Sequence, residues 1–139
     1  MSKLVEKINN IETIRDGIDI MMKYAEQDHK ENLEKTLGYS IDLEKNKYYL
    51  FNWGYTKTQK YIRVWRETED GTKKAFAFIV RLDNDKLFRR GDILLPRSWK
   101  KPARNQPRGN VFNGDYYISF IGPMELNTIK QLKKLRGEE

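Results

Sequence analysis

The segment from Gly91 to Asn110 constrains the fold more than any other stretch, because it contains three of the chain's four prolines. Each proline removes a backbone amide donor and pushes the residue before it toward extended geometry, so this segment cannot be a helix. It also carries five lysine and arginine residues and has no acidic residue after Asp92. The sequence therefore predicts a stiff, positively charged loop, whose Pro-rich part lies at residues 96–110.

The length of 139 residues suffices for one ordinary hydrophobic core, and we expect a single domain over residues 1–139. Aromatic residues make up 12% of the chain, which argues against intrinsic disorder. The lack of cysteine excludes disulfides and thiolate metal sites. No apolar run approaches the roughly 18 residues of a membrane span, and no signal peptide is evident, so we expect a cytoplasmic protein with no membrane partner.

Charge is distributed unevenly along this basic chain, whose formal net charge is +7. Residues 1–50 contain 8 Lys and Arg against 10 Asp and Glu, whereas residues 51–139 contain 19 against 10. The basic surface therefore belongs to the second part of the chain. A surplus of positive charge favours association with polyanions, although it does not identify them.

The first third of the chain has the pattern of an amphipathic helix. Apolar residues recur every three or four positions from Ile11 to Leu37, which places them on one helical face. Asn10 is the expected N-cap and Gly38 the expected C-terminal stop. Apolar residues nearer the N-terminus predict a short preceding helix or an extension, so we expect residues 1–38 to be helical. This apolar face either covers a sheet or forms a homo-oligomer interface.

After Asn46 the pattern becomes aromatic and β-branched, which is typical of strands. We expect an antiparallel sheet over residues 46–121 and a short helix over residues 123–136 with its leucines facing inward. The predicted fold class is thus α+β, with a long N-terminal amphipathic helix packed on an antiparallel sheet of about five strands and a short C-terminal helix. The individual strands are expected at residues 47–53, 60–66, 75–82, 93–95 and 115–121, with a further short one at 87–88.

Common catalytic motifs are absent from the sequence, including phosphate-binding glycine loops, zinc-protease, serine-hydrolase and calcium-loop patterns. His29 is the only histidine and makes a poor metal site alone. Asp83, Asp85 and Asp92 lie near strand ends and are the alternative, a Mg²⁺-dependent nuclease site, although turns favour aspartate anyway. We expect a protein that is not an enzyme, with no catalytic residue, no metal and no cofactor.

The basic loop is the predicted ligand-binding element. Arginine offers a planar fork for two phosphate oxygens, and a tryptophan ring can stack on a base. A glycine lets the backbone approach a ligand closely and can contribute its amide to an anion site. The alternative is structural: the tryptophan plugs the core, and the arginines bind carbonyls and acids of the fold. The predicted ligand-binding residues are Arg97, Trp99, Arg104, Arg108, Gly109 and Asn110.

Four short motifs in this region resemble small uncharacterised proteins of tailed bacteriophages. They are Gly91-Asp92-Ile93-Leu94, Ser98-Trp99-Lys100, Pro102-Ala103 and Arg108-Gly109-Asn110-Val111-Phe112. The similarity covers about residues 60–112, and this chain departs from the pattern by carrying Arg104 in place of lysine and by adding Pro107. The resemblance implies a phage or prophage origin and implies no activity and no site.

The leading hypothesis is a non-enzymatic phage or prophage accessory protein that binds a phosphate-bearing ligand through residues 97–110. The ligand would be a nucleotide signal of the host, sequestered as a form of counter-defence in the host cytoplasm. The alternatives are a nucleic-acid-binding protein and a protein–protein inhibitor of a host factor. The apolar helix face together with the tyrosines also predicts a homo-oligomer.

Overall fold

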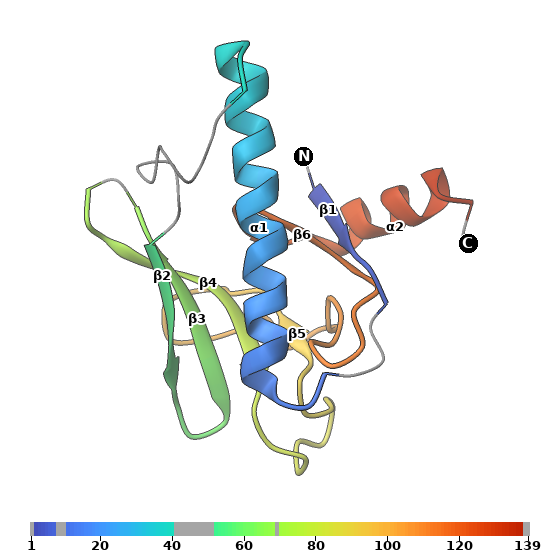
Figure 1. Cartoon of the computed structure of the whole chain (residues 1–139). Helices are drawn as coiled ribbons and strands as arrows, with labels where there is room; N and C mark the ends of the chain where they lie inside the picture. The colour runs from blue at the N-terminus through green and yellow to red at the C-terminus, as the bar shows by residue number, and fades with distance from the viewer. Residues whose placement is uncertain (1, 8–10, 41–51, 69, 138–139) are drawn as a thin grey trace.

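A computed structural model of the chain describes residues 2–7, 11–40, 52–68 and 70–137 (Figure 1). The two helices are α1 (Ile14–Leu37) and α2 (Leu126–Leu135). The described strands are β1 (Ser2–Val5), β2 (Asn52–Lys57), β3 (Tyr61–Glu67), β4 (Lys73–Val80), β5 (Ile93–Leu94), β6 (Tyr116–Ser119) and β7 (Gly122–Pro123).

The strands form two antiparallel sheets, and this arrangement corrects the prediction of a single sheet of about five strands. One sheet has the order β1-β6-β7 and the other the order β2-β3-β4-β5, which gives seven strands in the described part of the chain. The α+β class, the long N-terminal helix, the short C-terminal helix and the antiparallel pairing are confirmed.

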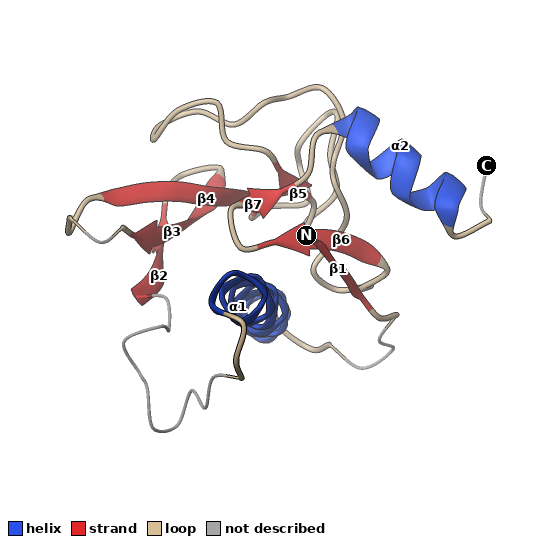
Figure 2. Cartoon of the chain, turned by 90° about the horizontal axis from the view of Figure 1, so that it is seen from above, coloured by secondary structure: helices blue, strands red, loops and turns tan. Residues whose placement is uncertain are grey.

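Helix α1 covers one side of the sheets, as Figure 2 shows, and its apolar face forms the main core. Met21 and Met22 are fully buried in the same cluster as Val64 and Ile79 of the larger sheet and Ile118 of the smaller one. The apolar face of the helix therefore covers sheet, as the spacing predicted. Burying a side chain of this size contributes about 1.5–3 kcal/mol.

The ends of α1 are set by local chemistry. Thr13 is the N-cap, with its Oγ1 accepting from the Asp16 amide at 3.1 Å, and the helix starts later than the prediction of a cap at Asn10. Asn10 itself lies outside the described residues. Gly38 ends the helix with φ of 80°, and its amide donates to the Glu34 carbonyl, as predicted.

Residues 2–5 form a strand, which corrects the prediction that residues 1–38 are helical throughout. Leu4 pairs with Tyr117 and Val5 pairs with Tyr116, so β1 completes the edge of β6. Val5 is buried in the main core. Pairing with a strand from the far end of the chain overrides the short-range apolar spacing that indicated a helix.

The β2–β3 hairpin lies farther along the chain than predicted. Of the predicted strand 47–53, residues 47–51 lie outside the described residues, and β2 continues through Gly54, where a turn was expected. Gly54 sits opposite Trp65, and a Cβ added to Gly54 would lie 2.5 Å from Cζ2 of that indole. The glycine therefore makes room for the tryptophan ring within a strand.

Further boundaries differ from the prediction, including those of the strands expected at 93–95 and 115–121, which are Ile93–Leu94 and Tyr116–Ser119. Strand β4 ends at Val80, and residues 87–88 form no strand because the amides of Leu87 and Phe88 donate to the Asp85 carboxylate instead. Gly122 pairs as part of β7, and α2 begins only at Leu126.

The inward orientation predicted for the leucines of α2 is wrong at its end, where Leu135 is 85% exposed. Helix α2 extends away from the sheets in Figure 1, and none of its residues is buried.

The face of the larger sheet opposite α1 carries a second, smaller core. Phe78, Val80, Phe88 and Leu94 are buried there together. Loops cross this side of the sheets in Figure 2. The larger sheet therefore has a helix on one face and loops on the other, and the basic loop belongs to this second, outer face.

Gly17 provides a test of how α1 packs. Alanine normally stabilises a helix interior by about 1 kcal/mol relative to glycine. Here a Cβ would lie 2.5 Å from the Val111 carbonyl oxygen, which belongs to the backbone and cannot rotate away. We predict that Gly17→Ala lowers the free energy of unfolding by about 1–2 kcal/mol in urea titrations. The exposed Lys23→Ala substitution on the same helix is the control, and a stabilised Gly17→Ala protein would contradict this packing.

Candidate functional site

The basic loop folds back on itself and presents a turn to solvent. Pro96 and Pro102 form an isolated antiparallel bridge, and the Ala103 amide donates to the Leu95 carbonyl at 2.7 Å. Within the turn, the amides of Arg97 and Ser98 both donate to the Lys101 carbonyl. Residues 97–101 are all exposed, so the turn presents its cations to solvent.

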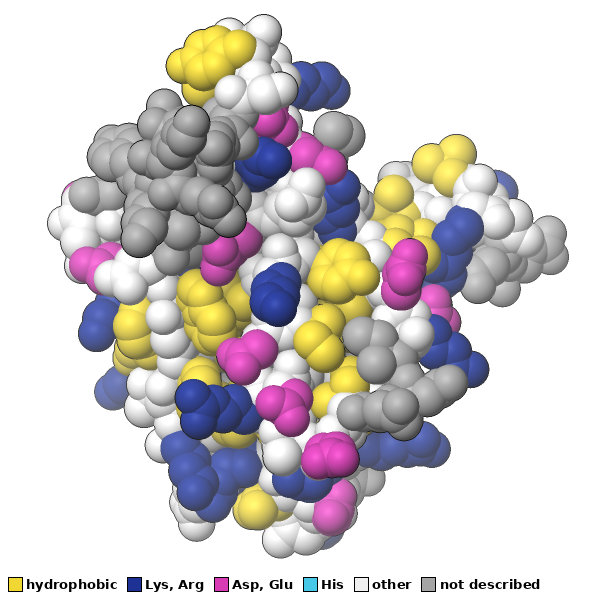
Figure 3. Space-filling view, in the orientation of Figure 1, with side chains coloured by type: hydrophobic (Ala, Val, Ile, Leu, Met, Phe, Trp, Pro, Cys, Tyr) yellow, Lys and Arg dark blue, Asp and Glu magenta, His cyan; other side chains and the backbone are white. Residues whose placement is uncertain are grey.

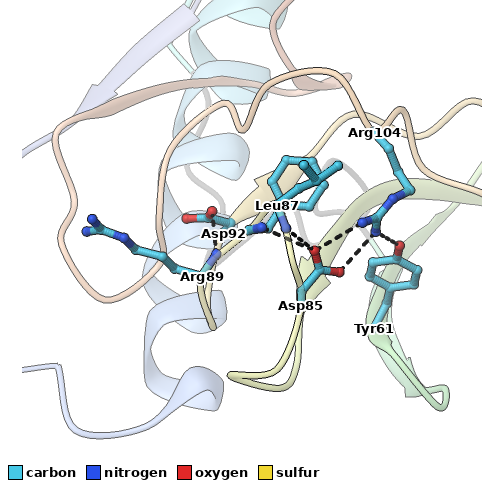
Figure 4. A network of polar contacts seen from close by, with 7 residues as sticks. Tyr61, Asp85, Leu87, Arg89, Asp92 and Arg104 are labelled. Carbon is cyan, nitrogen blue, oxygen red and sulfur yellow. Dashed lines mark hydrogen bonds and ion pairs between the residues drawn. The ribbon is translucent and has the colours of Figure 1, made fainter.

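Arg104 attaches the loop to the rest of the fold, as Figure 4 shows. Its guanidinium forms a two-pronged ion pair with Asp85, with N–O distances of 3.0 and 3.1 Å, and donates to the Tyr61 hydroxyl. Its Cζ also lies 4.9 Å from the centroid of the Phe88 ring. The bond from Arg104 lowers the pKa of Asp85 to about 2, with further contributions from two backbone amides. The structure uses this predicted ligand residue as a clamp.

Arg108 is also engaged within the fold, since only 1% of its side chain is exposed. Its Nε donates to the Met124 carbonyl at 2.9 Å and its Nη1 donates to Asn105 Oδ1 at 2.9 Å. Its Nη2 lies 3.8 Å from the carboxylate of Glu125. Burial lowers the pKa of Arg108. This arginine therefore joins the basic loop to the segment that precedes α2.

Gly109 and Asn110 support the backbone beside β5. A Cβ on Gly109 would collide with the side chain of Tyr116, and its φ of 153° favours glycine. The Asn110 amide nitrogen donates to Asp92 Oδ1 and to the Arg90 carbonyl, both at 3.0 Å, while its oxygen accepts from a backbone amide. The polar atoms of Asn110 are thus already engaged in organising this turn.

Trp99 lies on the surface and is 38% exposed, so it is not the core plug that was the structural alternative. Its carbonyl accepts from Arg63 Nε at 2.6 Å, and the Arg63 guanidinium carbon lies 4.5 Å from the centroid of the indole. Arg63 also contacts the buried Phe78 ring, at 5.8 Å from its centroid. The tryptophan is held against the sheet by a cation–π contact and still presents ring surface to solvent.

Sequence reasoning missed the residues of β3 and β4 that lie beside Trp99. A concave surface of about 280 Å³ is lined by Lys73, Lys74, Arg97 and Trp99, and its described lining contains no acidic side chain. Lys73 Nζ lies 4.4 Å from the centroid of the Trp65 ring. We call this surface the tryptophan face, and it consists of Arg63, Trp65, Lys73, Arg97 and Trp99, with Lys74 at its edge.

A signal for the tryptophan face was present in the alternation along β3. Ile62 and Val64 belong to the core under α1, so the residues between and beyond them, Arg63 and Trp65, must point to the other side of the sheet. A cation and a large aromatic residue on the solvent side of a strand are the expected signature of such a surface. Composition alone indicates only the loop, because the cations and aromatic residues of β3 do not stand out from those of the neighbouring strands.

Two other concave surfaces differ from it, and one of about 220 Å³, lined by Arg66 and Lys74, has no acidic side chain in its described lining but also no tryptophan. A larger concave region of about 580 Å³ is lined by Lys86, Arg89 and Arg90 but also by Asp83 and Asp85. Figure 3 shows acidic and basic side chains intermixed over the side that carries α1. The tryptophan face combines cations with exposed indole surface, and its one acidic neighbour in the β3–β4 ladder, Glu67, lies at its edge opposite Lys73, which makes it the strongest candidate for an anionic ligand.

Two of the three aspartates considered as a metal site are engaged within the fold. Asp85 is paired with Arg104, and Asp92 is largely buried, with its carboxylate accepting from the Arg89 and Asn110 amides. No group of three potential metal ligands exists in the described residues. Within the same residues, neither helix combines the length and the apolarity that crossing a membrane requires.

Comparisons with protein-family models, with curated proteins and with solved structures found no match to this chain.

A substitution at Arg108 tests whether this side chain stabilises the fold or serves a ligand. We predict that Arg108→Leu lowers the free energy of unfolding by about 2–3 kcal/mol, because it leaves buried acceptors without a donor. Chemical denaturation measures the effect, and the exposed Arg97→Leu substitution is the control, with an expected change within about 0.5 kcal/mol. An Arg108→Leu protein as stable as the unmodified chain would show that the buried contacts are dispensable.

The clamp between Arg104 and Asp85 predicts a pH dependence. Because the pKa of Asp85 in the folded protein is about 2 and its ordinary value is 3.8, its contribution to stability is complete above about pH 4 and disappears as the pH falls toward 2. Urea titrations should therefore show that the free energy of unfolding of the unmodified chain exceeds that of Asp85→Asn at pH 4 and that this difference disappears by pH 2. Asp83→Asn is the matched control. If the free energies of unfolding of the unmodified chain and of Asp85→Asn depend on pH in the same way, the clamp is contradicted.

Proposed function

We propose that this chain is a non-enzymatic binding protein for a phosphate-bearing ligand and that the tryptophan face is its binding surface. The observation that carries the proposal is the exposed indole of Trp99 beside Lys73, Lys74 and Arg97. Nucleotides and nucleic acids present an aromatic base together with phosphate, and this surface offers a partner for each of the two groups.

The electrostatics of the surface support an anionic ligand. None of Lys73, Lys74 and Arg97 forms an ion pair with an acidic residue in the described part of the chain. A phosphate would therefore displace no described ion pair from these cations, unlike from Arg104 and Arg108, although Lys73 contacts the Trp65 ring. The chain's net charge of +7 adds long-range attraction for polyanions.

The biological setting that we propose rests on the resemblance of four short motifs to phage proteins. In that setting the protein would act in the host cytoplasm by sequestering its ligand, as an accessory factor against host defence. A binding surface that holds a ligand without transforming it is sufficient for such a role.

The proposal is tested by isothermal titration of the full chain with cyclic dinucleotides, ADP-ribose and short oligonucleotides. We expect saturable binding of at least one of these ligands. For an oligonucleotide, Lys73→Gln and Arg97→Gln should each weaken binding and reduce the slope of log affinity against log salt by roughly 1, because each neutralises about one phosphate.

Lys23→Gln is the matched control, since it removes an exposed positive charge from α1 on the opposite side of the larger sheet. We expect its affinity to stay close to that of the unmodified chain. If none of the ligands binds, or if Lys23→Gln weakens binding as much as Lys73→Gln and Arg97→Gln do, the tryptophan face is not the site.

A further inference from the structure

We infer that the ligand of the tryptophan face is a single-stranded nucleic acid, whose neighbouring bases stack on Trp99 and Trp65. This inference rests on the proposed function and specifies its ligand class. It depends on the relative placement of the two rings, on how each ring is held, and on the shape and charge of the surface around them.

The two rings lie on the same side of the larger sheet. Trp65 and Arg63 are two residues apart on β3, so they point to the same face and are separated by roughly 7 Å along the strand. The Arg63 guanidinium contacts the Trp99 ring, so the indole of Trp99 lies over Arg63, two residues along β3 from Trp65. The two indoles therefore lie on the same face, with Trp99 exposed and Trp65 half-buried beneath the Lys73 ammonium, which a base stacking on Trp65 replaces.

Each ring is held in place before any ligand arrives. The Trp65 ring occupies the space that a side chain at Gly54 would fill, with the ammonium of Lys73 4.4 Å from its centroid. The Trp99 ring rests on Arg63, whose Nε also donates to the Trp99 carbonyl. Rings that are already ordered lose little conformational entropy on binding, which raises affinity.

The surface around the rings suits an extended strand better than a free nucleotide. The concave region beside Trp99 is open and small, at about 280 Å³, and its cations come from both β4 and the basic loop. A free nucleotide would use one ring and part of this charge, whereas a strand engages both rings and several cations. A duplex is disfavoured because its bases are already stacked and paired.

The experiment compares three ligands on the full chain at one fixed salt concentration. Fluorescence anisotropy measures a labelled single-stranded oligothymidylate, competition measures unlabelled thymidine monophosphate, and a labelled duplex of the same length is the third ligand. We expect the single strand to bind most tightly, and the mononucleotide to compete only at far higher concentration.

Substitution of the rings provides the direct test. Trp99→Ala and Trp65→Ala should each weaken binding of the single strand by roughly 5- to 150-fold, the range expected for one base–aromatic stack. Trp99→Phe and Trp65→Phe should keep most of the affinity, because a smaller aromatic ring still stacks. Trp53→Phe is the matched control, since Trp53 packs with the core under α1 and donates to Glu26. Thermal unfolding followed by circular dichroism verifies that each variant is folded.

The outcomes separate this inference from the proposed function. Stacking would be contradicted if the duplex binds as tightly as the single strand, or if Trp99→Ala and Trp65→Ala fold and bind normally. Either result would still be compatible with a phosphate-binding surface. If thymidine monophosphate displaces the labelled strand at concentrations similar to those of the unlabelled strand, only the claim that two rings bind neighbouring bases is contradicted. Failure of oligonucleotides to bind, together with binding of a cyclic dinucleotide that depends on Lys73 and Arg97, would contradict the inference only. Failure of every phosphate-bearing ligand would contradict both.

Discussion

The ion pair between Arg104 and Asp85 determines what the outer side of the protein can do, because it fixes the basic loop across the larger sheet. Together with the buried Arg108, it ties the loop to two different parts of the fold. These two arginines bind other groups of the protein, whereas the other cations of the turn face solvent and can contact a ligand. The attachment also brings Trp99 onto Arg63, which creates an aromatic surface that neither the loop nor the sheet has alone.

Much of the fold could be predicted because its causes are local. The three- and four-residue spacing of apolar side chains specified α1, and Gly38 specified its end. The errors arose where a distant segment decides the structure. Residues 2–5 form a strand only because β6 offers an edge to pair with, and Gly54 lies inside a strand only because Trp65 needs the space above it. Neither partner can be identified from short-range pattern.

The kind of residues that form the candidate site could be predicted, but not which individual residues form it. The composition of residues 91–110 correctly indicated a non-helical basic loop, yet composition does not show which arginines the fold itself uses. Whether Arg108 is buried depends on the position of Met124 and Glu125, which only tertiary packing sets. Conversely, Trp65 and Lys73 meet on one face only because the β3–β4 pairing shifts register between Val64 and Trp65, and such a bulge cannot be identified from the alternation of either strand alone.

The most direct test of the tryptophan face uses the intrinsic fluorescence of the chain. The sequence contains three tryptophans, so the Trp53→Phe protein emits only from Trp65 and Trp99. We predict that titrating this variant with a single-stranded oligonucleotide quenches its emission in a saturable way, in step with binding measured by anisotropy. Emission that stays unchanged while the oligonucleotide is bound would place the ligand elsewhere and contradict the central claim.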